Sequence, residues 1–201
     1  MGYYIFSHGV DFTAIDQVIG SSSQVLFDEV IKSEAFDLYA SQDSPGSITT
    51  KQALEDLIFD KPYDKKSAHA YWYAFIAISA KLGQVFSGTH EIKLSYETDL
   101  INHYLKADFG VDMKIEEILL NERPIARLPK VQDWPLHGVL FTADLLQLKQ
   151  QFSTITITDE ALEDLLEQDE EKEMAYDSIR QIKENVHFCL DNNLALLSFC
   201  H

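Results

Sequence analysis

Hydrophobic and polar positions change their period several times along the chain, and each change predicts an element. Apolar, aromatic and β-branched residues run through YYIFSHGV at 3–10, which predicts an opening strand. The run LALLSFC at 194–200 predicts a closing strand in the same way. Because an isolated strand leaves its backbone N–H and C=O groups unpaired, we expect the two terminal strands to pair with each other.

The polar and apolar positions between these strands repeat with a helical period. Helices are predicted at 16–19, 24–40, 51–59, 97–110, 113–121, 143–152, 159–167 and 171–190. Ser21 to Ser23, Thr50 and Thr158 stand where N-caps are expected. Asn192-Asn193 predicts a left-handed stop after 171–190. The residues predicted for the buried side of that helix are Ala175, Ile179, Ile182, Val186 and Cys189. The segment 67–83 is apolar on nearly every side, which is typical of a helix buried in the core.

The segment 122–138, ERPIARLPKVQDWPLHG, contains three prolines and no helical period. It predicts a long extended connection, of a length that is often functional. The chain is therefore expected to form one predominantly helical α+β domain over 1–201. We expect seven or eight helices besides the short one at 16–19, with strands 3–10 and 194–200 pairing in a small sheet.

The charge of the chain narrows the classes of partner. It has 33 acidic against 16 basic residues and a net charge of −17, which argues against nucleic acid or an anionic membrane, because phosphates need Lys and Arg. No run approaches the roughly 20 apolar residues that span a bilayer, and the start lacks the basic region of a signal peptide. With only two cysteines, a cytoplasmic protein is expected.

The acidic residues concentrate in DEALEDLLEQDEEKE at 159–173, which holds nine acids against one lysine. On a helix, four of them form a stripe opposite Leu162, Leu165 and Leu166. These candidate partner-binding residues are Glu160, Glu163, Asp164 and Glu167. Two interpretations stay open: the stripe steers a basic partner, or it is a solvated face that serves solubility.

A second candidate site joins the start of the apolar helix to the proline-rich connection. Its residues are His69, Tyr71, Tyr73, Arg123, Arg127 and Trp134. One interpretation is a small-molecule pocket, with His69 as acid or base and with Arg123, Arg127 and Lys130 holding an anion or a carboxylate. The other is an aromatic core cluster strapped by prolines, with the charges facing water.

The ending HFCLDNNLALLSFCH gathers both cysteines and two histidines. His187 and Cys189 lie on different faces of a helix, and Cys200 and His201 on different faces of a strand, so each pair offers at most one metal ligand. A strand of this length also carries Cys200 too far from Cys189 for a disulfide. We therefore predict a buried Cys189 and no metal site; no motif indicates a cofactor or a catalytic residue.

Several stretches carry a resemblance to a known kind of domain. YYIFSHGVD, ALEDLIFDKP, YWYAFIAISAKLG, RPIARLP, DWPLHG and LALLSF resemble bacterial domains of unknown function of about this size. In outline, with terminal strands around helices, the chain is also similar to the YfbM family. The resemblance implies a fold and no activity.

The expected function is that of a non-enzymatic acidic binding protein, an immunity or antitoxin type of inhibitor that covers a basic partner protein. The alternative is a small-molecule-binding protein or enzyme that uses the pocket near His69, Tyr71 and 122–138. A third hypothesis is an interaction module that uses exposed apolar surface. The pattern predicts no oligomeric state.

Overall fold

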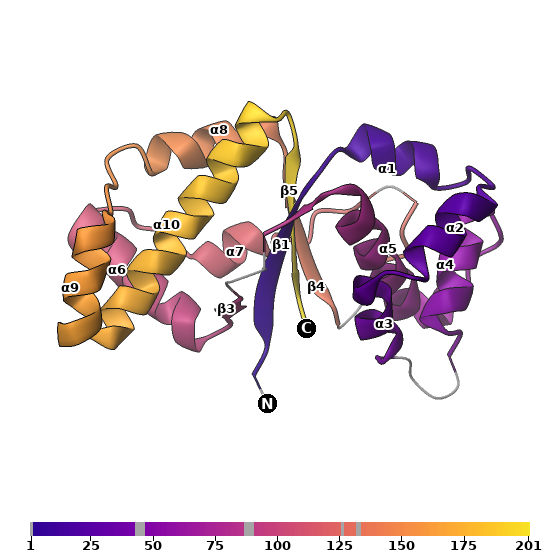
Figure 1. Ribbon diagram of the computed structural model, residues 1–201, viewed down its shortest axis with the longest axis horizontal. Coiled ribbons are helices and arrows are strands. Elements are labelled where there is room, and N and C mark those ends of the chain that lie inside the picture. Colours follow the sequence, from indigo (N-terminus) through magenta and orange to yellow (C-terminus); the bar gives the residue numbers. More distant parts are fainter. Residues whose placement is uncertain (1, 43–46, 87–90, 126, 132–133) are drawn as a thin grey trace. The chain divides into compact units, whose positions relative to one another are not determined.

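The computed structural model describes residues 2–42, 47–86, 91–125, 127–131 and 134–201. Contacts within the chain divide it into two units, whose elements are labelled in Figure 1. Unit 1 comprises 1–9, 86–122 and 136–201, and unit 2 comprises 10–85 and 123–135. The chain thus leaves unit 1 after its first strand and visits unit 2 twice. A single domain over 1–201 stays a prediction.

Unit 1 is built on strands from both ends of the chain. The strands are β1 (Tyr4–Val10), β3 (Ile92–Lys93), β4 (Leu136–Leu140) and β5 (Ala195–Cys200). Strand β5 lies between β1 and β4, and β3 pairs with β1. The Tyr4 amide donates to the His201 carbonyl, 3.4 Å away, and the hydroxyls of Ser7 and Ser198 are 2.8 Å apart. The predicted pairing of the terminal strands is confirmed.

Strand β4 was not predicted, because residues 122–138 were expected to form an extended connection throughout. It pairs antiparallel with β5, with Leu136 opposite Cys200. A Cβ atom on Gly138 would overlap the Leu119 carbonyl oxygen and lie 2.6 Å from the Asn121 amide nitrogen, so only glycine fits there. The Asn121 side chain donates to the Val139 carbonyl (3.0 Å) and accepts from the Val139 amide (3.2 Å), as a neighbouring strand would.

The described part of unit 1 also contains five helices. They are α6 (Tyr96–Phe109), α7 (Ile115–Leu119), α8 (Thr142–Gln151), α9 (Asp159–Gln168) and α10 (Glu170–Asp191). Helix α10 packs against α6, α8, α9 and β5 (Figure 1). The residues predicted for its buried side are all buried: Ala175, Ile179, Ile182, Val186 and Cys189. Asn193, with φ +56°, ends it in the left-handed conformation that the sequence indicated.

Unit 2 surrounds one apolar helix. Its elements are α1 (Phe12–Val18), α2 (Gln24–Val30), α3 (Glu34–Ala40), α4 (Thr50–Ile58), the 3-10 turn η1 (Lys65–Ser67), α5 (Ala68–Leu82) and the short strand β2 (Gln84–Val85). Helix α5 contacts α1, α2, α3 and α4, and its residues 70–79 are all buried. Its prediction as a core helix is confirmed.

Local hydrogen bonds explain two differences from the predicted helices. The predicted helix 24–40 is two helices, because the Ser33 hydroxyl accepts from the Phe36 amide (3.2 Å) and donates to the Val30 carbonyl (2.7 Å). Helix α4 is capped by Thr49, whereas Thr50, predicted as its cap, is buried in the first turn. Ten α-helices occur in the described ranges, against seven or eight predicted, and the predominantly helical α+β class is confirmed.

Within the described residues, no helix combines the length and the apolar character needed to cross a membrane.

Candidate functional site

Helix α9 presents the acidic residues of unit 1. The Thr158 hydroxyl accepts from the Ala161 amide (3.2 Å) and caps the helix, as the sequence predicted. Asp159 and Glu160 occupy the first turn, where the positive end of the helix dipole favours carboxylates. The helix packs on α10 and buries Leu162, of which 7% is exposed. Because Leu162 packs on α10, the residues on the opposite side of α9 face away from the core.

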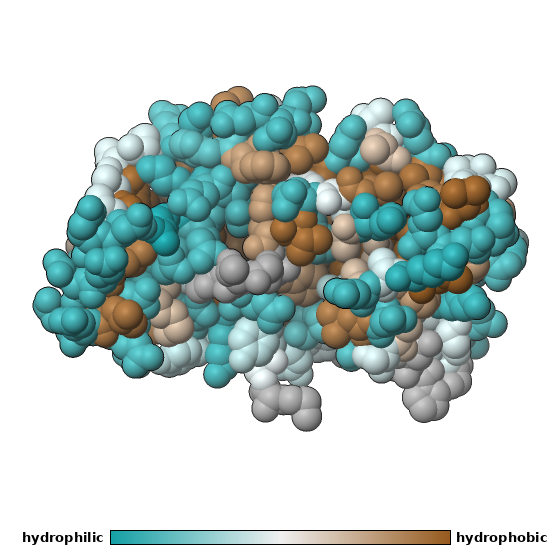
Figure 2. Space-filling model, viewed as in Figure 1, coloured by the Kyte–Doolittle hydropathy of each residue, from teal (hydrophilic) through white to brown (hydrophobic). Residues whose placement is uncertain are grey.

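All four predicted stripe residues, Glu160, Glu163, Asp164 and Glu167, are exposed. In the part of the chain that the structure describes, none of them forms an ion pair. Arg180 of α10 pairs instead with Asp159 at 2.5 Å and with Asp177 at 2.7 Å. In Figure 2, the surface at the left-hand end, where Figure 1 places α9, is mostly hydrophilic and contains smaller hydrophobic patches. Within the described residues, no cation is therefore paired with the stripe.

Leu166 departs from the sequence pattern, which grouped it with Leu162 and Leu165 opposite the acids. It is 60% exposed in the structure. It follows Glu163 by three residues and precedes Glu167, so it borders the stripe on the helix surface. The exposed face of α9 therefore combines four carboxylates with one large apolar side chain.

Unit 2 contains a cavity of about 450 Å³. It is lined by Tyr63, Lys65, Arg127, Leu128, Pro129 and Lys130. These residues come from the segment after α4 and from the proline-rich connection, which are far apart in the sequence. Three of the six are cationic, although the chain as a whole is strongly acidic.

Buried residues of α5 hold both walls of this cavity. The Tyr71 hydroxyl accepts from the Asp64 amide (2.7 Å) and donates to the Asp56 carboxylate (2.9 Å), and burial raises the pKa of Tyr71 to about 12. Its ring lies 4.8 Å from the ring of Tyr63, between centroids. On the other wall, the Trp72 indole N–H donates to the Pro129 carbonyl at 2.8 Å. Both walls are thereby fixed to the core helix of the unit.

The six residues predicted for the pocket have different places relative to this cavity. Only Arg127 is among the described residues that line the cavity, and Tyr71 lies one layer behind it. The Tyr73 ring stacks instead on Tyr39, at 5.9 Å and 14°, and burial raises its pKa. Arg123 and Trp134 are half-buried and are not among the described residues that line the cavity.

His69 is half-buried, and its Nε2 atom is buried without a hydrogen-bond partner among the residues described. It does not line the cavity, so the structure does not place it as an acid or base there. The lining residues that the sequence did not assign to the pocket are Tyr63, Lys65, Leu128 and Pro129. Lys130 was predicted, with Arg123 and Arg127, to hold an anion or a carboxylate. The basic, aromatic segment KPYDKK at 61–66 was the available signal.

Unit 1 also contains a buried carboxylate that the pattern did not predict. Glu97 is 4% exposed and accepts hydrogen bonds from the Ser178 hydroxyl (2.5 Å) and the Lys93 amide (3.0 Å). Ser178 borders a cavity of about 20 Å³, which has room for one water molecule and no substrate. The arrangement ties α6 to α10 and β3.

Cys189 and Cys200, both buried, are free thiols. Burial raises the pKa of each to about 12, so both are protonated and poorly nucleophilic at neutral pH. The Cys189 thiol donates to the Ala195 carbonyl at 3.8 Å. No group of side chains able to hold a metal ion occurs within the described ranges.

Comparison with known proteins identifies one family. A family model described as a domain of unknown function (DUF7691) matches residues 1–201. No curated protein and no solved structure matches the chain. The resemblance to domains of unknown function is thereby confirmed, and the similarity in outline to the YfbM family stays a prediction.

Proposed function

The chain belongs to the DUF7691 family of domains of unknown function, and from that premise we propose that it is a non-enzymatic binding protein for a basic partner protein. In this role it acts as an immunity or antitoxin type of inhibitor and covers the basic surface of its partner. The observation that carries the proposal is the face of α9, where four exposed carboxylates have no ion-pair partner in the described chain.

The electrostatics of this face favour association with a cation-rich surface. Glu160 and Glu163, and Glu163 and Glu167, are three and four residues apart, so like charges repel along the helix. A basic partner relieves that repulsion, and complementary charge accelerates encounter at low salt. The net charge of −17 extends the same field beyond α9.

Leu166 supplies the short-range part of the proposed contact. Its exposed side chain borders the carboxylates, so a partner that reaches them also covers it. Burial of apolar area is insensitive to screening by salt, whereas attraction between exposed charges weakens beyond about 8 Å at physiological ionic strength. Salt is therefore expected to slow association strongly and to change dissociation little.

The proposal includes a bacterial cytoplasmic location, where thiols stay reduced, and it excludes nucleic acid as the partner. A chain with twice as many acids as bases repels phosphate over most of its surface.

Affinity capture from a lysate of the source organism tests the proposal. The bait proteins are the wild type, the α9 variant Glu163→Lys/Asp164→Lys/Glu167→Lys, and a control variant with the same change in charge. The control, Asp16→Lys/Glu34→Lys/Asp37→Lys, alters three exposed carboxylates of unit 2. We expect the wild type and the control to retain one basic protein at low salt and to release it at high salt. Equal capture by the α9 variant would remove α9 from the proposal.

Association kinetics with the captured protein make the test quantitative. We expect the α9 variant to associate about tenfold or more slowly than the control, because steering is lost. Leu166→Ser is expected to leave the association rate unchanged and to accelerate dissociation. Identical rates for all variants at low salt would contradict the proposed face.

A further inference from the structure

We propose that the cavity of unit 2 binds a small organic phosphate, a molecule that joins a phosphate group to a flat apolar part. The proposal does not depend on the acidic face of α9, which belongs to unit 1. It rests on the charge, the shape and the fixed walls of the cavity.

The charge argument starts from Lys65, Arg127 and Lys130. All three are exposed, and within the described part of the chain none of them forms an ion pair. Acids outnumber bases by 33 to 16, so three un-neutralised cations around one cavity are unexpected on composition alone. No carboxylate is among the described residues that line the cavity, although Asp60 lies beside Arg127 at Gly20. Cations gathered around a cavity in this way bind phosphate, for which a guanidinium also supplies directional N–H donors.

Arg127 keeps donors available for such a ligand. One of its N–H groups donates to the Ile19 carbonyl at 2.6 Å, which fixes the guanidinium. A guanidinium has five N–H donors, and this is the one hydrogen bond described for Arg127. The side chain is therefore oriented by the protein and still able to donate to an anion.

The shape of the cavity argues for more than a free phosphate ion. A volume of about 450 Å³ falls in the range of small-molecule sites, roughly 300–1,000 Å³. Tyr63, Leu128 and Pro129 give it apolar walls. The Tyr63 ring is backed by the ring of Tyr71 and so offers a supported surface for a flat group to stack on.

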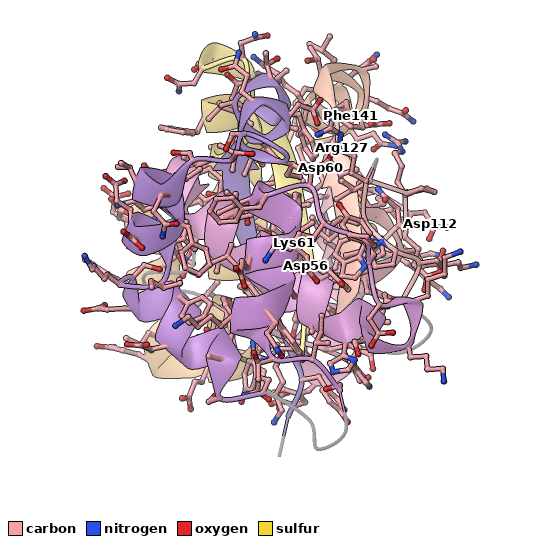
Figure 3. The ribbon with its side chains drawn as sticks, turned by 90° about the vertical axis from the view of Figure 1, so that its right-hand side faces the viewer. Asp56, Asp60, Lys61, Asp112, Arg127 and Phe141 are labelled. Carbon is pink, nitrogen blue, oxygen red and sulfur yellow. The ribbon has the colours of Figure 1, made fainter. Side chains whose placement is uncertain are left out.

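The backbone around Arg127 is held in conformations that residues with a Cβ atom adopt rarely. Arg127 has φ +68° and Asp60 has φ +54°, and both lie against Gly20, whose φ is +79°. A Cβ on Gly20 would lie 3.4 Å from the Arg127 Nη1 atom and 3.6 Å from the Asp60 Cβ atom. Figure 3 shows Arg127 and Asp60 next to each other. Left-handed residues of this kind cluster at ligand sites, where the surrounding contacts maintain them.

The fixed walls favour binding, because the backbone segments that form them need little further ordering when the ligand enters. The segment of Tyr63 is anchored through the Tyr71 hydroxyl, and the segment of Pro129 is anchored through the Trp72 indole. The cavity is therefore prepared for its ligand by the core of the unit.

Isothermal titration calorimetry at low ionic strength tests the proposal with three probes: adenosine 5′-monophosphate, pyrophosphate and adenosine. The site variant is Lys65→Ala/Lys130→Ala. The control, Lys32→Ala/Lys51→Ala, removes two exposed lysines of unit 2 that have no ion pair in the described chain. Thermal unfolding of each variant verifies that it folds.

We expect saturable binding of adenosine 5′-monophosphate to the wild type and the control, and at least a tenfold weaker affinity in the site variant. Tyr63→Ala is expected to weaken the binding of adenosine 5′-monophosphate and to leave that of pyrophosphate unchanged. Adenosine alone is expected not to bind. The absence of saturable binding of both phosphates to the wild type, or an equal loss in the control, would overturn the proposal.

Two further outcomes separate this proposal from the proposed function. The α9 variant is expected to bind adenosine 5′-monophosphate as the wild type does. Loss of protein capture with retained phosphate binding would leave the cavity proposal standing, and the reverse result would leave the α9 proposal standing.

Discussion

The acidic face of α9 and the cationic cavity of unit 2 are opposite in charge and in construction. One helix of ten residues presents the whole acidic face, and its single buried residue, Leu162, suffices to orient it. Two segments distant in sequence form the cavity, and α5 must bring them together. The charged face therefore needs one helix and its contact with α10, whereas the cavity exists only if several tertiary contacts of unit 2 form.

The cores of the two units also differ in how they are built. Unit 1 depends on strand pairing between the two ends of the chain, and unit 2 depends on helices packed around α5. Both tryptophans, Trp72 and Trp134, belong to unit 2. Tryptophan fluorescence therefore monitors unit 2, and hydrogen exchange of β4 and β5 monitors unit 1.

Gly138→Ala is expected to have the largest effect on unit 1. The added methyl group would overlap the backbone of Leu119 and Asn121, so we expect the free energy of unfolding to fall by about 3 kcal/mol or more. The loss is measured by urea unfolding with two probes, hydrogen exchange of β4 for unit 1 and tryptophan fluorescence for unit 2. If the urea midpoint from fluorescence shifts as much as the midpoint from hydrogen exchange, the two units unfold together.

Gly110→Ala is the matched control for that substitution. Gly110 also belongs to unit 1 and has φ +69°, but its added Cβ would meet nothing within 4 Å. Its expected cost is about 1 kcal/mol, from the left-handed backbone alone. Equal losses for the two glycines would contradict the close approach of β4 to Leu119 and Asn121.

His8 gives unit 1 an expected dependence on pH. It is 2% exposed in β1, and burial lowers its pKa from 6.5 to about 4. Between these values the unfolded chain binds more protons than the folded one, so the free energy of unfolding falls as the pH drops from 6.5 to 4. The expected loss is roughly 3 kcal/mol.

Urea unfolding of the wild type and of His8→Gln at pH 7.0, 5.5 and 4.5 measures this contribution, because the other titrating groups are common to both proteins. The wild-type curve is expected to fall more steeply below pH 6.5. Parallel curves would show that His8 does not become protonated on unfolding.

Tyr71→Phe addresses the walls of the cavity in unit 2. It removes the hydroxyl that joins the Asp64 amide to the Asp56 carboxylate, so a loss of about 2 kcal/mol is expected. Urea unfolding followed by tryptophan fluorescence measures it. The control is Tyr63→Phe, whose hydroxyl has no hydrogen bond in the described chain and whose expected effect is within about 0.5 kcal/mol. Similar losses would mean that the bridge of Tyr71 does not hold the wall.

Leu166→Ser is expected to have the smallest effect, within about 0.5 kcal/mol, because the side chain is 60% exposed. Leu162→Ser on the same helix is expected to cost several kcal/mol, since it buries a hydroxyl in place of an apolar group. Thermal unfolding of both variants checks the contrast. A large loss of stability for Leu166→Ser would mean that Leu166 stabilises the fold, which would contradict its role as an exposed contact for a partner.

The sequence by itself determined the features that depend on neighbours a few residues away. The buried side of α10, the cap at Thr158, the left-handed stop at Asn193 and the acidic stripe of α9 all follow from helical period and capping chemistry. The two terminal strands were also predicted, because unpaired strands at both ends leave each other as the partner.

Only the tertiary structure decided where distant segments meet. Strand β4 is five residues long and contains a glycine, so its pattern is weak, and pairing with β5 defines it. Most lining residues of the cavity were not predicted for the same reason. A pocket was expected beside 122–138, but of the six residues assigned to it only Arg127 lines the cavity, because Tyr71 and Trp72 anchor other residues there. A local pattern records the period of one element, whereas a cavity depends on hydrogen bonds between elements that the period does not encode.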